Sequence, residues 1–326
     1  MRERVERVFA FLDELVLTLP VPSSHRELVQ VHLGVGRELA DAWPEMPCIQ
    51  LPLSVHKAIT SDEGPAIPVA AACTLMYLGA DLLDSVLDHE VPRSWQSRDS
   101  TEITLAATTL LATLPHFSIS RLQEQRVSPG KLWVLSHHIA ETLLTMSAGQ
   151  YEDLRLPNLE NVSLGDCRAM VERKSGSANA LFAKAGATLA TMDPSTIEAC
   201  AAFGACLGIA KQLVSDVWDI WGEDDSRDLL NGKRTLPIVH ALSVLQGEQR
   251  KQLQRLLVAA RESAEHHDEV RALLATTGSV RYTALIVWFY NQRAQDHLAA
   301  ASLQKPAERE LRMLLAQASL LHPSQT

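Results

Sequence analysis

Carboxylates recur at helical spacing in a long apolar segment of the chain, residues 67–90. Asp81, Asp84 and Asp88 are three or four residues apart, and Tyr77 continues the same stripe. Side chains at this spacing lie on one face of a helix, and the apolar residues around them predict that the helix is buried. A buried carboxylate needs a cation nearby. That cation is either a bound Mg²⁺ ion, which prefers oxygen ligands, or the side chain of an Arg or Lys partner.

A second segment with the same properties covers residues 203–223. One of its faces is apolar, and the other carries the oxygen-containing side chains of Gln212, Ser215, Asp216, Asp219 and Glu223. For either segment alone, a salt-bridged surface is the simpler interpretation, because aligned acidic residues are common on solvated helices. Both segments are predicted to be buried, however, and this favours a metal site.

The elements that position these side chains are predicted to be helical throughout. The chain has 326 residues, of which 46% are hydrophobic and 5% aromatic. Its apolar residues are mostly Leu, Ala and Val, and Leu and Ala lose little side-chain freedom in a helix. Apolar residues follow helical periodicity in almost every segment, and the interruptions are short turns. We therefore expect an all-α fold of about ten to twelve helices in a single domain, residues 1–326.

Composition and charge exclude several classes of protein. The net charge of −9 gives no overall attraction for nucleic acid or anionic lipid, so phosphate binding must be local. The five cysteines lack metal-ligand spacing and are expected to be reduced thiols. The N-terminal segment lacks the apolar core of a signal peptide. The longest uncharged stretch, residues 64–80, contains two prolines and is short for a bilayer span. We expect a soluble, cytoplasmic protein without a membrane span.

The motifs of the chain resemble those of one enzyme family. Gly-Lys-Arg-Thr-Leu-Pro at 232–237 follows the second acidic segment, whose aspartate-rich motif covers 211–219. DSVLD at 84–88, GQxxD at 149–153 and ERKS at 172–175 precede it in the same order. In this order the motifs resemble the trans-isoprenyl diphosphate synthase, or polyprenyl synthetase, family of the class I isoprenoid synthase superfamily. The resemblance covers residues 65–300 and implies a single-domain helical bundle.

The resemblance implies a reaction and a cofactor. An allylic prenyl diphosphate would be ionised, its prenyl cation transferred to an acceptor, and pyrophosphate released. Mg²⁺ would stabilise the charge that develops on the leaving diphosphate. Three ions are implied, with Asp84 and Asp88 binding two of them, and Asp219 with Ser215 or Asp216 binding the third.

The resemblance also implies residues that contact the substrate. Lys174 and Lys233 would bind the allylic diphosphate, and Gln212 lies in the second aspartate-rich motif. Gln150 and Asp153 would support the first metal cluster, although both are equally interpretable as ordinary helix hydrogen-bonding residues. The bulky Tyr77, just before the first motif, is expected to shorten the pocket for the prenyl chain.

Three departures from the family pattern bear on which reaction the protein catalyses. The upstream GKxxRP motif is absent, with Lys57 the single stray candidate there, and the RRG pattern after the first aspartate-rich motif is also absent. Both losses affect the family's site for isopentenyl diphosphate. Ser85 and Ser215 each replace an aspartate of the motifs. The spacing of Ser215, Asp219 and Glu223 also matches the metal triad of class I terpene synthases.

Several functions within and beyond this family therefore remain open. A terpene synthase would cyclise the substrate without isopentenyl diphosphate. The short loop between Asp219 and Lys233 resembles that of bacterial pheromone isoprenyl transferases, which prenylate a peptide. A non-catalytic subunit of a heteromeric prenyl diphosphate synthase is the alternative outside catalysis. The family is typically dimeric, which implies a homodimer, and the subunit alternative implies a heteromer.

Overall fold

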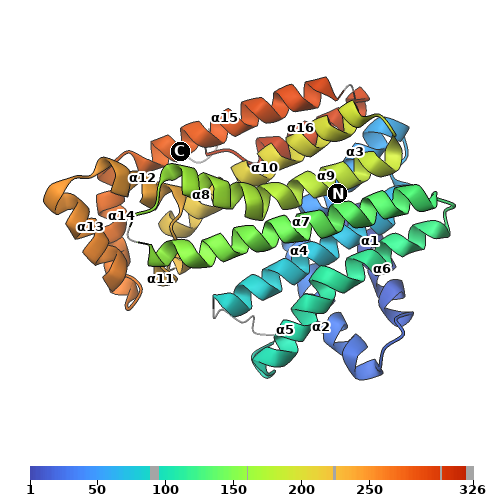
Figure 1. The fold of residues 1–326 in the computed structure, drawn as a ribbon, viewed down its shortest axis with the longest axis horizontal. Helices are drawn as coiled ribbons and strands as arrows, with labels where there is room; N and C mark the ends of the chain where they lie inside the picture. The colour runs from blue at the N-terminus through green and yellow to red at the C-terminus, as the bar shows by residue number, and fades with distance from the viewer. Residues whose placement is uncertain (89–94, 160, 223–224, 302, 321–326) are drawn as a thin grey trace. The chain divides into compact units, whose positions relative to one another are not determined.

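The computed structural model describes residues 1–88, 95–159, 161–222, 225–301 and 303–320, and every regular element in these ranges is a helix (Figure 1). The α-helices are α1 (Arg2–Leu17), α2 (Ser23–Ala42), α3 (Pro47–Thr60), α4 (Ile67–Leu87), α5 (Ser100–Thr108), α6 (Leu114–Ser120), α7 (Pro129–Arg155), α8 (Leu164–Val171), α9 (Ser177–Ala190), α10 (Pro194–Trp221), α11 (Arg227–Leu230), α12 (Leu236–Val244), α13 (Gly247–Ala259), α14 (His267–Thr276), α15 (Ser279–Ala300) and α16 (Lys305–Ala316). The shorter helical turns are η1 (Gly64–Ala66), η3 (Thr109–Thr113), η4 (Arg121–Gln123), η5 (Leu156–Asn158), η6 (Glu172–Gly176) and η7 (Ala264–His266). The all-α prediction is confirmed.

More helices are present than the ten to twelve expected, because short turns divide several long helical runs. The π-helical turns η3 and η6 separate α5 from α6 and α8 from α9. Helix α3 begins at Pro47, a residue suited to the first turn of a helix, and continues through Pro52. Helix α10 begins at Pro194, nine residues before the acidic segment that predicted it.

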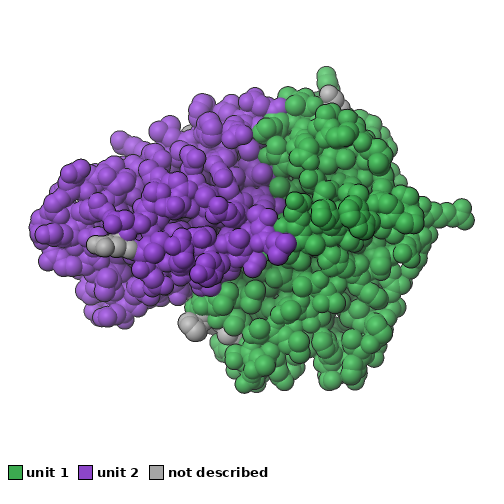
Figure 2. Space-filling model, viewed as in Figure 1, with its two compact units in different colours: residues 1–143, 179–204, 297–314 green, residues 144–178, 205–296, 315–326 purple. Residues whose placement is uncertain are grey.

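The chain folds into two compact units (Figure 2). Unit 1 contains residues 1–143, 179–204 and 297–314, and unit 2 contains residues 144–178, 205–296 and 315–326. The unit boundaries fall inside long helices such as α7 and α10. The single-domain assignment stays a prediction.

Helix α4 forms the centre of unit 1. It contacts α1, α3, α5 and α6, and its residues 68–76 are all buried. A Cβ atom on Gly79 would lie 2.6 Å from the backbone nitrogen of Leu111, so α4 and η3 approach closely at this point. The predicted burial of the first acidic helix is thus confirmed for its N-terminal half, and its C-terminal half is partly exposed.

Within the described part of the chain, three helical segments are long and apolar enough to cross a membrane, judged by length and composition: Gly64–Leu87, Ser100–Gln123 and Pro194–Trp221. The bent pair Ala264–Thr276 and Ser279–Ala300 would be a fourth. In the first segment the protein interior covers 72% of the most apolar window, which suits the central helix of a compact unit. The expected lack of a membrane span stays a prediction.

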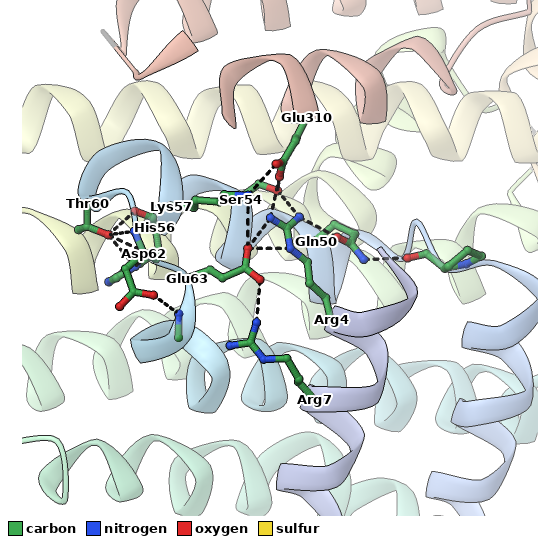
Figure 3. A network of polar contacts seen from close by, with 12 residues as sticks. Arg4, Arg7, Gln50, Ser54, His56, Lys57, Thr60, Asp62, Glu63 and Glu310 are labelled. Atoms are coloured by element: carbon green, nitrogen blue, oxygen red, sulfur yellow. Dashed lines mark hydrogen bonds and ion pairs between the residues drawn. The ribbon is translucent and has the colours of Figure 1, made fainter. Parts of the chain in front are cut away.

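A buried ion-pair network joins distant parts of unit 1 (Figure 3). Arg4 of α1 lies 2.5 Å from Glu63 and 2.6 Å from Glu310 of α16, and it also donates to two polar side chains of α3. Lys57 of α3 lies 2.9 Å from the other oxygen of Glu310. Arg7 shares Glu63 at 2.9 Å. The network therefore holds α1 and α16 on α3.

Replacing Arg4 by methionine is expected to lower the free energy of unfolding by about 3 kcal/mol, because two carboxylates lose a buried partner. Urea unfolding followed by circular dichroism measures the change. The matched control is Arg312→Met, because Arg312 pairs with Glu308 on the surface of α16. The free energy of unfolding of Arg312→Met should fall by less than about 1 kcal/mol. Equal losses in the two variants would contradict a structural role for the buried network.

Unit 2 contains a hydrophobic cluster that includes the chain neighbours of two of its acidic residues. The buried members are Ile220, Leu229, Ile238, Ala241, Leu253, Leu257, Ala260, Val270 and Leu274. Ile220 directly follows Asp219, and Leu229 directly follows Asp228. Because close packing fixes both apolar residues, the two aspartates beside them have defined backbone positions.

Candidate active site

Two lysines of unit 2 share one carboxylate oxygen. Lys174 of η6 and Lys233, just before α12, donate to Oδ2 of Asp153 on α7 at 2.8 and 3.0 Å. Lys233 and Asp153 are buried, and Lys174 is partly buried. Burial opposes ionisation of Asp153, but the two ammonium groups outweigh it and lower the pKa of this carboxyl. Two ammonium groups gathered at one point form a local concentration of positive charge, which suits an anionic ligand.

Two glycines allow these residues to meet. A Cβ atom on Gly149 would lie 2.6 Å from the backbone nitrogen of Lys174, so only glycine permits this approach of α7 to η6. Asp153 follows one helical turn later. Gly232 has a φ of +67°, a left-handed conformation that glycine adopts without strain, and it turns the chain directly before Lys233. The π-helical geometry of η6 is also frequent at functional sites.

A hydrogen-bond chain connects η6 to α10. Ser175 Oγ donates to Gln212 Oε1 at 2.7 Å, and Gln212 Nε2 donates to Asp216 Oδ1 at 2.8 Å. Gln212 was expected to contact substrate. In the structure both ends of its amide take part in this hydrogen-bond chain, which holds the buried Asp216, and the substrate role of Gln212 stays a prediction.

Neighbouring carboxylates of unit 2 affect the ionisation of Asp216 and Asp228. Burial, together with the charges of Asp153 and Asp219, raises the pKa of Asp216 to about 7. Burial and the charges of Asp216 and Asp219 also raise the pKa of Asp228. The site thus concentrates more negative charge than its surroundings stabilise, and a divalent cation would relieve this repulsion.

The oxygen donors of this site fit Mg²⁺. In proteins Mg²⁺ commonly takes one or two carboxylates and completes its shell with water and phosphate oxygens. Among the described residues, no three His, Cys, Asp or Glu side chains are close enough to hold a metal ion by themselves. An ion bound here would therefore need ligands in addition to these described side chains, such as the oxygens of a diphosphate.

The first acidic stripe lies at the C-terminal end of α4, in unit 1. Asp84 is in the last turn, and Asp88 directly follows the helix, where its N–H donates to the Asp84 carbonyl at 2.8 Å. Both are half-buried, as is Tyr77, whose pKa is raised by burial. Asp81 is more exposed, yet the surrounding protein and then the Asp84 charge raise its pKa.

The remaining sequence-predicted residues have different settings. Gln150 is half-buried on α7, and the side chain of Ser215 is exposed on α10. Glu223 lies outside the described residues, so its predicted metal role is not addressed by the structure. Lys57, the candidate for the missing upstream motif, has its ammonium group committed to Glu310. Metal and substrate roles for the predicted site residues stay predictions.

Sequence reasoning missed three polar residues of this site. Asp219 accepts hydrogen bonds from the Ser226 hydroxyl and from the Asp228 N–H. His267 in turn accepts a hydrogen bond from the Ser226 N–H. Ser226 and Asp228 follow the C-terminal end of α10 in the chain, where its helical periodicity carries no information. The acidic residues at 223–228 were the available signal for Asp228.

Solved structures share this fold. The chain superposes on the geranylgeranyl pyrophosphate synthetase of Pyrococcus horikoshii with a TM-score of 0.79 at 20% identity, over 98% of this chain and 99% of that one. It superposes on the geranylgeranyl pyrophosphate synthase of Corynebacterium glutamicum, complexed with isoprenyl diphosphate and magnesium, with a TM-score of 0.81 at 18% identity, over 98% of each chain. These likenesses define the class of fold as that of the all-α isoprenyl diphosphate synthases.

The sequence comparisons identify the family. Residues 55–276 match the family model described as polyprenyl synthetase. The geranylgeranyl diphosphate synthase of Mycobacterium tuberculosis is 29% identical over 192 residues, which are 57% of this chain and 55% of that protein. The (2E,6E)-farnesyl diphosphate synthase of Mycobacterium bovis is 27% identical over 228 residues, 65% of this chain and 62% of that protein. The alignments thus span less than two thirds of these relatives. The chain belongs to the polyprenyl synthetase family.

Proposed function

We propose that the protein is a Mg²⁺-dependent prenyltransferase that ionises an allylic prenyl diphosphate, transfers the prenyl cation to an acceptor and releases pyrophosphate. The observation that carries this proposal is the pairing of Lys174 and Lys233 on the buried carboxylate of Asp153, close to the buried Asp216 of α10. Anion-binding lysines and metal-binding acids are the two sets of groups that a leaving diphosphate requires. The names of the mycobacterial relatives support the same substrate class.

The two lysines stabilise the leaving group in this proposal. Cleavage of the allylic C–O bond moves negative charge onto the diphosphate, and donors already held in position stabilise that charge without reorganising. Asp153 keeps both ammonium groups near one point despite their mutual repulsion. Mg²⁺, when bound, would supply further electrophilic stabilisation of the diphosphate oxygens.

We propose the metal ligands from the resemblance and the local chemistry. Asp84 and Asp88 would bind two Mg²⁺ ions, and Asp219 would bind a third. Asp216 is a better supported partner for Asp219 than Ser215, because its buried negative charge needs a cation and the Ser215 side chain is exposed. The terpene-synthase triad with Glu223 remains the alternative.

The acceptor is less defined than the allylic substrate. Lys57, the single stray candidate for the missing upstream motif, belongs to the ion-pair network that holds α16 on α3, and we assign it a structural role there. The absence of that motif favours an acceptor other than isopentenyl diphosphate. Such an acceptor would be a peptide, a small molecule or the substrate's own double bond. The intact lysine pair favours an enzyme over a non-catalytic subunit.

The direct test is an assay with geranyl, farnesyl or geranylgeranyl diphosphate and Mg²⁺, each with and without isopentenyl diphosphate. Pyrophosphate release and mass spectrometry of the products are measured together. Mg²⁺-dependent release with at least one substrate is expected. Release that requires isopentenyl diphosphate would identify an elongating synthase, and release without it would identify a cyclase or another acceptor. The proposal would be contradicted if no pyrophosphate were released and no Mg²⁺-dependent binding of pyrophosphate were detected.

Replacing Tyr77 by alanine is expected to shift the preferred substrate or product toward longer prenyl chains, because removal of the phenol ring deepens the proposed pocket. Relative rates with the three allylic diphosphates measure this shift. The exposed Tyr151 provides the control variant Tyr151→Ala. An unchanged chain-length preference in Tyr77→Ala would remove this residue from the pocket floor.

We also propose a cytoplasmic location, from the reduced cysteines, and a homodimer, from the family. All five cysteines are free and buried, as expected for thiols in a reducing compartment. Sedimentation of the purified protein would measure the oligomeric state.

A further inference from the structure

A chain of buried hydrogen bonds leads from the α13–α14 connection to Asp219. His267 Nε2 lies 3.2 Å from the carbonyl oxygen of Ala260, and the Ser226 N–H donates to His267 Nδ1 at 3.3 Å. Ser226 Oγ then donates to Asp219 Oδ1 at 2.5 Å. Ser226 and His267 are each only 1% exposed, so water does not compete for these contacts.

The direction of each hydrogen bond follows from the donors present. Because a backbone N–H donates to Nδ1 of His267, this nitrogen is the acceptor, and the ring proton is on Nε2, where it donates to Ala260. Ser226 Oγ accepts from the N–H of Leu229 at 3.1 Å, so its own proton is available for Asp219. Each donor in this series of hydrogen bonds therefore faces an acceptor.

The Asp219 carboxylate receives two hydrogen bonds on one oxygen. Oδ1 accepts from Ser226 Oγ and from the Asp228 N–H at 3.0 Å. None of the described residues donates a hydrogen bond to Oδ2. Two donors on Oδ1 fix the rotation of the carboxylate and leave Oδ2 for a ligand. The buried neighbours Ile220 and Leu229 hold both ends of this arrangement.

We propose that Ser226 and His267 are positioning residues that orient Asp219 for Mg²⁺. The inference rests on the proposed function, since it assigns Asp219 to the metal. Neither residue belongs to the aspartate-rich motif or to the GKRTLP segment. Groups that hydrogen-bond to metal ligands commonly change metal affinity about 10–100-fold when they are removed.

A purely structural role would look different from a positioning role. Ser226 also caps the N-terminus of α11, so its loss lowers stability in either case. Only a positioning role makes metal affinity depend on its hydroxyl. The matched control is Ser163→Ala, because Ser163 caps α8 and its side chain pairs with Asp166, outside the site.

The test measures Mg²⁺ affinity from the rise in melting temperature at a fixed concentration of inorganic pyrophosphate. Ser226→Ala and His267→Ala are expected to weaken Mg²⁺ binding by about 10-fold or more. Ser226→Thr should restore it, and Ser163→Ala should leave it unchanged. Wild-type affinity in a folded Ser226→Ala variant would overturn the inference. If Ser226→Ala does not fold, wild-type Mg²⁺ affinity in His267→Ala would overturn the inference.

A double-mutant cycle shows whether Ser226 acts through Asp219. In an Asp219→Asn background the further loss caused by Ser226→Ala should disappear, because the two residues form one unit. If Ser226→Ala lowered Mg²⁺ affinity by the same factor in the wild-type and Asp219→Asn backgrounds, the inference would be overturned. If the wild-type protein showed no Mg²⁺-dependent effect of pyrophosphate, the proposed function itself would fail instead.

Discussion

Pyrophosphate release by the Lys233→Ala variant is expected to be about 100–1,000-fold slower than release by the wild-type protein. Lys233 is buried and held beside Asp153, so in the proposed enzyme its ammonium group would already be in the site when the diphosphate leaves. Single-turnover measurements with an excess of enzyme report this step separately from product release. Folding should be largely preserved, because Asp153 keeps Lys174 as a partner.

Two further variants make this expectation specific. Lys233→Arg should not restore activity, because a planar guanidinium cannot replace a compact ammonium group in a buried position. Lys184→Ala should keep wild-type activity, because Lys184 pairs with the exposed Glu198 in unit 1. Wild-type rates in Lys233→Ala would show that this lysine pair does not bind the leaving group.

The second large effect is expected from Asp216→Asn, which should stabilise the metal-free protein while removing its response to Mg²⁺. The pKa of Asp216 is raised from 3.8 to about 7, so the folded state binds this proton more tightly than the unfolded chain. Ionised Asp216 therefore destabilises the metal-free protein, and this penalty grows from about pH 4 to pH 7 and is complete above pH 7. The asparagine side chain cannot ionise, and its carbonyl oxygen still accepts from Gln212.

Urea unfolding in EDTA at pH 8 should show a gain of about 2–4 kcal/mol for Asp216→Asn. The gain should shrink as the pH falls toward about 4, because Asp216 of the wild-type protein is then protonated in the folded state and increasingly so in the unfolded chain. In Asp216→Asn, the stabilisation of the folded protein by Mg²⁺ and pyrophosphate should be lost. The control Asp296→Asn removes an exposed carboxylate of α15 and should change stability by less than about 0.5 kcal/mol. A loss of stability in Asp216→Asn would mean that this carboxylate already has a sufficient cation within the protein.

Much of the fold was predictable because its signals are local. Helical periodicity in α4 and α10 depends on neighbouring residues along the chain, and both helices were predicted from their acidic stripes. The effect of a proline inside a helix is harder to predict from local signals. Helix α3 runs through Pro52, since burial among unit 1 helices outweighs the local cost of a proline. The division of long runs by η3 and η6 likewise depends on packing that a one-dimensional pattern does not contain.

The site was predictable only where a motif marks it. Lys174, Lys233 and Asp153 come from three separate motifs, and the structure joins them at one oxygen atom. That junction depends on the approach of α7 to η6 at Gly149, a tertiary contact. His267 was not predictable, because it lies 41 residues from Ser226 in the chain and nothing local distinguishes it from other histidines.

The sharing of Asp153 by two lysines has a consequence for turnover. In the proposed enzyme, the Asp153 carboxylate would compete for both ammonium groups with the substrate diphosphate and equally with the product. Asp153 would therefore weaken the retention of pyrophosphate, since each lysine has an internal partner to return to. In the proposed enzyme, the residue that assembles the anion site would also be the residue that empties it after each reaction.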